Sequence, residues 1–257
     1  MKKVHFAGAA LALILLPACE SYVQTTSGKD YLARYENSWQ PDCPAAEGGL
    51  DSEIRSIAAI DPNLQFPARI GLARLENGRL TGIPGDESAM WLDVAEELGP
   101  LYGEFVPVSP MIAAMVSPER TGRDRISGPQ VVADIRRGAA RQHLDYVFVY
   151  EVTATSKKDD NAFALADATI IGFFLLPGRN VKAEAVASGL MLDVRNGYPY
   201  ATLTTYAEEK SLSRGSAAWG RMQTLADTAS EVAVAELVIE VEDAIKQLAA
   251  ASLEPGS

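Results

Sequence analysis

The sequence predicts an α+β fold (mixed α/β), in which a β-α-β-α-β unit is followed by a β-meander and a long C-terminal helix packed on a mixed sheet. Three observations support this prediction. Short apolar runs alternate with amphipathic segments in the first half of the chain. Three extended segments then follow one another, and a single apolar stripe at helical spacing runs over 217–250. Because crossover units give parallel strands and meanders give antiparallel ones, we expect a mixed sheet.

The crossover unit begins near Leu64. The predicted strands are 69–75, 104–108 and 145–152, and the predicted helices are 87–98, 110–116 and 129–143. We expect Asp86 to cap the helix over 87–98 and Gly99-Pro100 to end it. In the helix over 129–143, the inward face is predicted to hold Val131, Val132, Ile135 and Ala139.

The second half is predicted to hold three consecutive strands and one long helix. The expected strands are 168–176, 181–194 and 199–207, and the expected helix is 217–250. Asn196-Gly197 favours a tight hairpin between the last two strands. The length of the apolar run 170–176 favours a buried strand; the alternative is an exposed apolar surface for a partner or a membrane.

The N-terminal segment predicts export and anchoring. Lys2 and Lys3 precede an apolar run over 6–16, which is shorter than the about 20 residues of a membrane-spanning helix. Leu16-Pro17-Ala18-Cys19 resembles the lipobox of bacterial lipoproteins. That resemblance implies cleavage before Cys19, diacylglycerol on its sulfur and N-acylation, with chains such as palmitate that together anchor stably. Glu20, by the same resemblance, implies the outer membrane. The alternative is an ordinary secretory signal with an incidental Cys19.

These features divide the chain into three segments. Residues 1–18 are predicted to be a lipoprotein signal peptide, 19–63 a polar tether with a short helix, and 64–257 a single periplasmic α/β domain with a long C-terminal helix. The tether is predicted because this stretch is polar and rich in turn formers. Within it, Ile54 and Ile57 share one face of a short helix that Asp51 is expected to begin.

Composition excludes several classes of function. The 257 residues include 23 Lys and Arg against 34 Asp and Glu, a formal net charge of −11, with two Cys and two His. Nucleic-acid binding needs a basic face to meet the phosphates. Two cysteines make neither a disulfide scaffold nor a four-thiolate zinc site. The sequence therefore predicts no nucleic-acid partner, no metal site and no cofactor.

Few side chains could carry chemistry, and each has a structural explanation. His143 lies where a helix meets a strand, and capping of the helix is favoured over catalysis. Cys43 is interpreted as a thiol without a role, and the alternative is an intermolecular disulfide. The glycine-rich segment 78–85 stands where a phosphate loop would lie, but it lacks the Gly-Lys-Ser/Thr ending and predicts a plain connection.

The carboxylates fall into two helical groups, which predict solvated faces rather than a catalytic pair. The groups are Asp93, Glu96 and Glu97 in one helix, and Glu231, Glu236, Glu240, Glu242 and Asp243 in the other. A glycosidase pair stays open as a minor alternative, because the separation that defines such a pair is not readable from sequence. No catalytic residue is predicted.

Three stretches carry a resemblance to a known family. They are residues 145–150, the Ile-Ile-Gly and Pro-Gly segment over 168–178, and 187–200 with its Asp-Val hairpin. In this order they resemble the rhombotarget lipoprotein family, without the C-terminal sorting tail of some members. More distantly, the element order is similar to the CsgG, LpoB and TolB N-terminal-like periplasmic domains. The resemblance implies a lipid-anchored periplasmic α/β domain that binds other envelope proteins.

These inferences lead to one functional prediction and one alternative. We predict a non-enzymatic lipoprotein on the periplasmic face of the outer membrane of a Gram-negative bacterium, held by a lipid on Cys19. It would support envelope assembly or transport through protein contacts, with an oligomer possible. The alternative is a lipid-tethered hydrolase that acts on envelope glycans through carboxylates.

Overall fold

The structure is a computed structural model that describes residues 19–36, 50–118, 128–154, 185–208 and 218–253. Its strands form one mixed sheet in the order β1-β7-β6-β5-β2-β3, with β4 paired to β2. The predicted α+β class, including a long C-terminal helix, is confirmed. The predicted strand over 168–176 lies outside the described residues.

The parallel part of the sheet comes from the predicted crossover unit. Strand β2 (Ala68–Glu76) pairs in parallel with both β4 (Gly103–Pro107) and β5 (Tyr146–Ala154). The connecting helices are α3 (Gly85–Leu98), α4 (Pro110–Val116) and α5 (Gly128–Arg141). The order and approximate bounds of these elements agree with the prediction.

The antiparallel part follows. Strand β5 pairs with β6 (Ala185–Asp193), and β6 pairs with β7 (Pro199–Ala207). A turn over 194–198 that contains Asn196-Gly197 joins β6 to β7, so the connection is longer than the tight hairpin predicted. Gly197 has a φ of 79°, and the Asp193 carboxylate accepts hydrogen bonds from the amides of Arg195 and Asn196. Helix α8 (Ala218–Leu253) then crosses the sheet.

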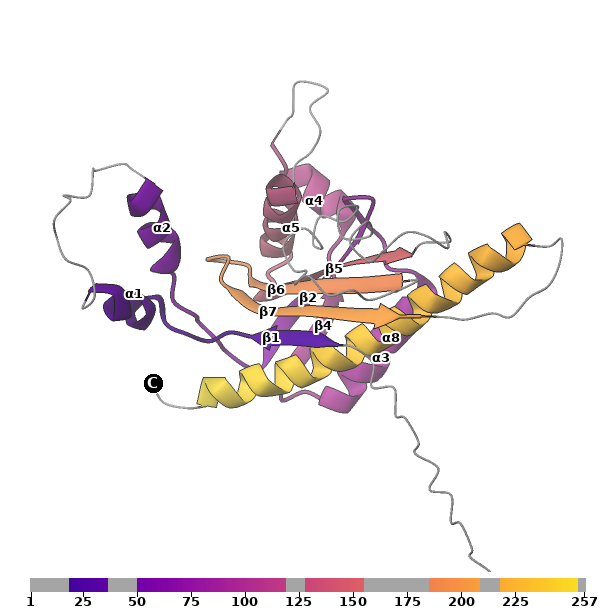
Figure 1. Cartoon of the computed structure of the whole chain (residues 1–257). Helices are drawn as coiled ribbons and strands as arrows, with labels where there is room; N and C mark the ends of the chain where they lie inside the picture. The colour runs from indigo at the N-terminus through magenta and orange to yellow at the C-terminus, as the bar shows by residue number, and fades with distance from the viewer. Residues whose placement is uncertain (1–18, 37–49, 119–127, 155–184, 209–217, 254–257) are drawn as a thin grey trace, which may run out of the picture.

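Two helical layers cover the sheet, α3 and α8 on one face and α4 and α5 on the other (Figure 1). Strand β5 contributes apolar side chains to both faces of the sheet, because successive side chains of a strand alternate. On the face covered by α3 and α8 these are Tyr146, Phe148 and Tyr150, and on the face covered by α4 and α5 they are Val147 and Val149. The stripe that predicts α8 is buried as expected at Ala229, Ala233, Leu237, Val241, Ala244 and Leu248.

A glycine makes room for the aromatic residues of the first cluster. Trp91 of α3 packs against Phe148, with ring centroids 5.7 Å apart, and against Tyr150, at 5.5 Å. On the neighbouring strand, a Cβ added at Gly189 would lie 2.0 Å from Cζ of Phe148. The Phe148 ring therefore occupies the space that a side chain at position 189 would need.

The N-terminal region departs most from the prediction. The polar tether expected over 19–63 instead contains a strand, β1 (Glu20–Val23), which extends the sheet by pairing antiparallel with β7. Two helices follow, α1 (Gly28–Glu36) and α2 (Leu50–Ala58), of which only α2 was expected. A strand of four residues is too short to show a hydrophobic periodicity. The hydrogen bonds that hold it in the sheet come from the backbone, so the side chains in the sequence do not reveal them.

Two local predictions are corrected. Helix α3 begins two residues earlier than expected, so Pro84 is its N-cap, no side chain caps it, and Asp86 lies inside its first turn. The segment after β2 is more than a plain connection: Asn77 and Gly78, with φ values of 51° and 72°, turn the chain into the short strand β3 (Arg79–Thr81).

Candidate functional site

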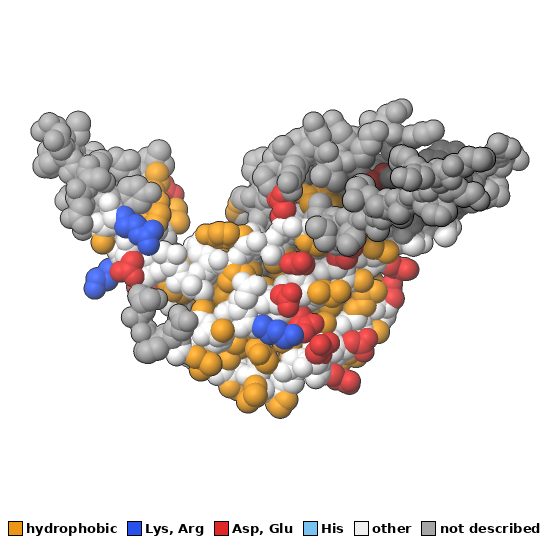
Figure 2. Space-filling view, turned by 60° about the horizontal axis from the view of Figure 1, so that its bottom comes forward, with side chains coloured by type: hydrophobic (Ala, Val, Ile, Leu, Met, Phe, Trp, Pro, Cys, Tyr) orange, Lys and Arg blue, Asp and Glu red, His pale blue; other side chains and the backbone are white. Residues whose placement is uncertain are grey.

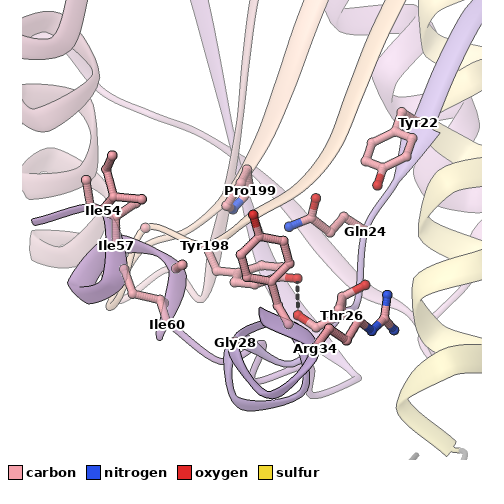
Figure 3. A pocket seen from close by; sticks show the side chains of 13 residues that line it. Tyr22, Gln24, Thr26, Gly28, Arg34, Ile54, Ile57, Ile60, Tyr198 and Pro199 are labelled. Atoms are coloured by element: carbon pink, nitrogen blue, oxygen red, sulfur yellow. Dashed lines mark hydrogen bonds between the residues drawn. The ribbon is translucent and has the colours of Figure 1, made fainter. Parts of the chain in front are cut away.

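A cleft lies between the N-terminal elements and the β6–β7 turn (Figure 3). Its volume is about 550 Å³, and β1, α1, α2 and the turn each contribute to its lining. The lining is mainly aromatic and aliphatic, with Tyr22, Tyr31, Ile54, Ile57, Ile60 and Tyr198 among its residues. None of its described lining residues is an Asp or a Glu, so the cleft is suited to binding apolar groups.

Several apolar side chains of this cleft are open to solvent. Tyr22, Tyr31 and Ile54 are exposed, and Ile57 is 64% exposed. Ile54 and Ile57 share the predicted face of α2, yet that face borders the cleft and not the core of the sheet. Exposed apolar surface gathered in one place typically marks an interaction site.

The walls of the cleft are held by hydrogen bonds between distant segments. The Asp61 carboxylate accepts from the Ser27 hydroxyl at 2.8 Å and from the Gly28 amide at 2.7 Å, so it caps α1 from a position beyond α2. The Ser27 hydroxyl and the backbone amides of α1 lower the pKa of Asp61. In turn, the Asn196 side chain donates to the Asp61 carbonyl at 3.1 Å. This chain of contacts ties α1 to the β6–β7 turn.

Tyr198 supplies a second tie across the cleft. Its hydroxyl donates to the Thr26 carbonyl at 2.7 Å (dashed line in Figure 3). Burial raises the pKa of Tyr198, so this hydroxyl keeps the proton it donates. The cleft is therefore largely formed before any ligand arrives.

An open sheet edge runs along the same region. The Gln24 amide donates to the Tyr200 carbonyl at 2.7 Å, and hydrogen bonds in antiparallel pairs alternate along a strand. The backbone groups of Ser21 and Val23 consequently point away from β7. Among the described residues, β7 is the only strand paired with β1. An unpaired edge of this kind can accept an added strand.

Cys19, the predicted lipid attachment residue, directly precedes β1. Its side chain is half-buried, and burial together with the carboxylates of Glu240 and Glu236 raises the pKa of its thiol to about 11. Burial and Glu240 also raise the pKa of Glu236, whose Oε2 is buried and has no hydrogen-bond partner in the described structure. Two carboxylates of α8 therefore lie beside the predicted anchor.

A separate buried charge cluster lies at the carboxyl ends of the parallel strands β2 and β5. The Glu87 carboxylate accepts from Arg74 Nε at 2.9 Å and from the Tyr150 hydroxyl at 2.7 Å. Burial and Glu87 raise the pKa of Tyr150. Glu151, the next residue of β5, is also buried but lies on the opposite face of the sheet from Tyr150, where it accepts from the Gly78 amide at 3.3 Å. These carboxylates are occupied by internal donors, so we assign the cluster a structural role.

The remaining predicted residues are placed as follows. His143 is exposed, and its backbone, with a φ of 58°, takes the left-handed conformation just after the end of α5. Its carbonyl accepts from the Arg69 guanidinium at 3.2 Å. Cys43 lies outside the described residues. Among the carboxylates of the two predicted acidic groups, Glu242 forms an ion pair with Lys246. The negative charges of Glu97 and Asp243 also act on Lys246 and help to raise its pKa. Among described residues, no group of three His, Cys, Asp or Glu could hold a metal ion.

Sequence reasoning missed most of the cleft. Ile54 and Ile57 were expected on one helical face, but Tyr22, Asp61 and Tyr198 come from segments far apart in the chain. The Asn196-Gly197 signal did indicate the turn that carries Tyr198.

No described helix is long and apolar enough to span a bilayer.

Comparisons with known proteins give little further information. No family model matches the sequence, and no characterised protein matches it either. Among solved structures, the chain is similar to a dodecameric PelC variant from Paraburkholderia phytofirmans, at 11% identity over 68% of this chain and 93% of that one, with a TM-score of 0.26. It is also similar to a bacterial aryl acylamidase of the amidase signature family, at 14% identity over 79% of this chain and 51% of that one, with a TM-score of 0.21. At these TM-scores, neither likeness bears on fold or function.

Proposed function

We propose that this chain is a lipid-anchored lipoprotein on the periplasmic face of the outer membrane, and that it binds a protein partner in envelope assembly or transport without catalysing a reaction. The observation that carries the binding role is the preformed apolar cleft of about 550 Å³ beside the open edge of β1. The anchor rests on the lipobox-like residues that end at Cys19. The resemblance to rhombotarget and CsgG-like lipoproteins remains a prediction.

Two substitutions of equal exposure test the binding role. Ile57 in the cleft is 64% exposed and Leu92 on α3 is 65% exposed, so an Asp at either position leaves the core intact. After crosslinking in the intact envelope, we expect Ile57→Asp to lose a crosslinked partner that Leu92→Asp retains. Equal crosslinking in both variants, or a chain that crosslinks to no partner, would refute the cleft as a binding site.

The anchor is tested separately by Cys19→Ser. We expect the variant to leave the outer-membrane fraction, because it lacks the sulfur to which the lipid would attach. A mature Cys19→Ser protein that still partitions with the outer membrane would refute lipidation as the anchor.

The hydrolase alternative depends on carboxylates. The described structure brings Glu236 and Glu240 together and raises the pKa of Glu236, a property that general acids need. The apolar cleft, however, has no carboxylate among its described lining residues. Release of soluble glycan from envelope fragments by the purified protein, abolished by Glu236→Gln, would favour the alternative.

A further inference from the structure

The predicted anchor is joined to the sheet without a linker. Cys19 is followed at once by β1, whose first residue, Glu20, pairs with Thr204 of β7. Consecutive Cα atoms are about 3.8 Å apart, so a lipid on Cys19 would hold the edge of the sheet at the membrane surface. The protein face nearest to Cys19 must then lie close to the headgroups.

That face belongs to α8. Side chains alternate along a strand, so Cys19 points to the same side as Val23, which packs against the cluster formed by α3 and α8. The effect of Glu240 and Glu236 on the Cys19 thiol places it beside the middle of α8. A lipid on this sulfur would therefore leave the protein along α8.

The surface of α8 at this point combines two exposed apolar residues with two half-buried carboxylates. Val232, Glu236, Ile239 and Glu240 are spaced by three or four residues, so they share one helix face. Val232 and Ile239 are exposed, Ile239 at 57%. Figure 2, which looks toward the side of α3 and α8, shows apolar side chains interspersed with acidic ones.

We propose that this face, formed by Val232, Glu236, Ile239 and Glu240, is the membrane-contacting surface of the domain, with Ile239 at the headgroup level. The proposal rests on the proposed lipidation of Cys19. Exposed apolar side chains beside an attached acyl chain can enter the boundary between headgroups and acyl chains.

This orientation has a consequence for the other surfaces. Helices α4 and α5 cover the opposite face of the sheet, so they would point away from the bilayer (Figure 1). Strand β1 is four residues long, about 13 Å at 3.3 Å per residue, so the apolar cleft at its far end would lie within a short distance of the membrane.

The test uses the lipidated protein, purified in detergent and reconstituted in vesicles of phosphatidylethanolamine and phosphatidylglycerol. In a Cys43→Ser background, Ile239→Cys and Met111→Cys each carry an environment-sensitive fluorophore. Met111 is the matched control, because it is 78% exposed on α4, across the sheet from α8. We expect headgroup-level lipid quenchers to reduce the emission at 239 several-fold more than at 111.

Equal quenching at the two positions, or quenching at 111 alone, would overturn the proposal. If the mass of the protein shows a lipid on Cys19 and position 239 is still not quenched, the anchor stands and only this orientation fails. If Cys19 carries no lipid, both the proposed function and this inference fail.

Discussion

Glu87→Gln should destabilise the protein strongly, although the substitution preserves the size of the side chain. The Glu87 carboxylate, only 9% exposed, holds Arg74 Nε at 2.9 Å and the Tyr150 hydroxyl at 2.7 Å. The neutral amide of Gln can still accept from Tyr150, but it cannot balance the charge of Arg74. Removal of one partner from a buried ion pair costs about 3–5 kcal/mol.

The expected loss lies near the lower limit of that range. Arg74 retains a second carboxylate, Glu76, at 3.5 Å, but this residue is exposed and compensates only in part. We therefore expect Glu87→Gln to lower the free energy of unfolding by about 3 kcal/mol. For a domain of this size, that corresponds to a fall in Tm of about 6–12 °C.

The matched control is Glu104→Gln. Glu104 is also paired with an arginine of β2, Arg69, at 2.6 Å, but its side chain is 60% exposed. Solvent-exposed ion pairs contribute about 0–1 kcal/mol, so this variant should change Tm by less than about 4 °C. Thermal unfolding followed by circular dichroism measures both variants. If the two variants lower Tm by the same amount, burial does not determine the strength of these pairs and the reasoning is refuted.

Three further predictions concern other parts of the molecule. Gly189→Ala should lower the free energy of unfolding by about 3 kcal/mol, because its Cβ would lie 2.0 Å from the Phe148 ring; Phe148→Leu in the same chain should restore part of the loss in urea unfolding. Asp61 has a lowered pKa, so its capping of α1 is present above the ordinary Asp pKa of about 3.9 and is lost as pH falls through the lower folded value. Amide hydrogen exchange should accordingly show α1 opening in Asp61→Ala at pH 7, because Ala offers no oxygen to accept from Ser27 and Gly28, and a normal exchange rate there would contradict the cap. In unlipidated protein carrying Cys43→Ser, alkylation of Cys19 should keep accelerating up to pH about 11, whereas a plateau near pH 8.5 would show an unburied thiol.

The elements that could be predicted from sequence are those whose packing imposes a long pattern. The stripe of α8 continues over many turns, and the apolar run of β5 is buried on both faces, so each leaves a clear signal. The position of the turn between β6 and β7 was predictable because Asn and Gly favour turns whatever surrounds them, although the turn over 194–198 is longer than the tight hairpin predicted. In each case the cause lies inside the segment.

The elements that were missed depend on contacts between distant segments. Strands β1 and β3 are four and three residues long, and backbone hydrogen bonds to neighbouring strands place them in the sheet. Asp61 caps α1 although 33 residues separate it from Gly28, and no local motif reports such a cap. The cleft combines β1, α1, α2 and a distant turn, so it could not be predicted from the α2 face alone.

The pairing of β1 with β7 also constrains the order of folding. Glu20 and Thr204 are neighbours in the sheet but are separated by most of the chain. Ribosomal synthesis produces β1 first and β7 almost last, so the edge of the sheet stays incomplete until nearly the whole domain has emerged. Contacts between residues so far apart in sequence form late in folding. We therefore expect β1 to dock late, on a sheet whose parallel strands have already assembled.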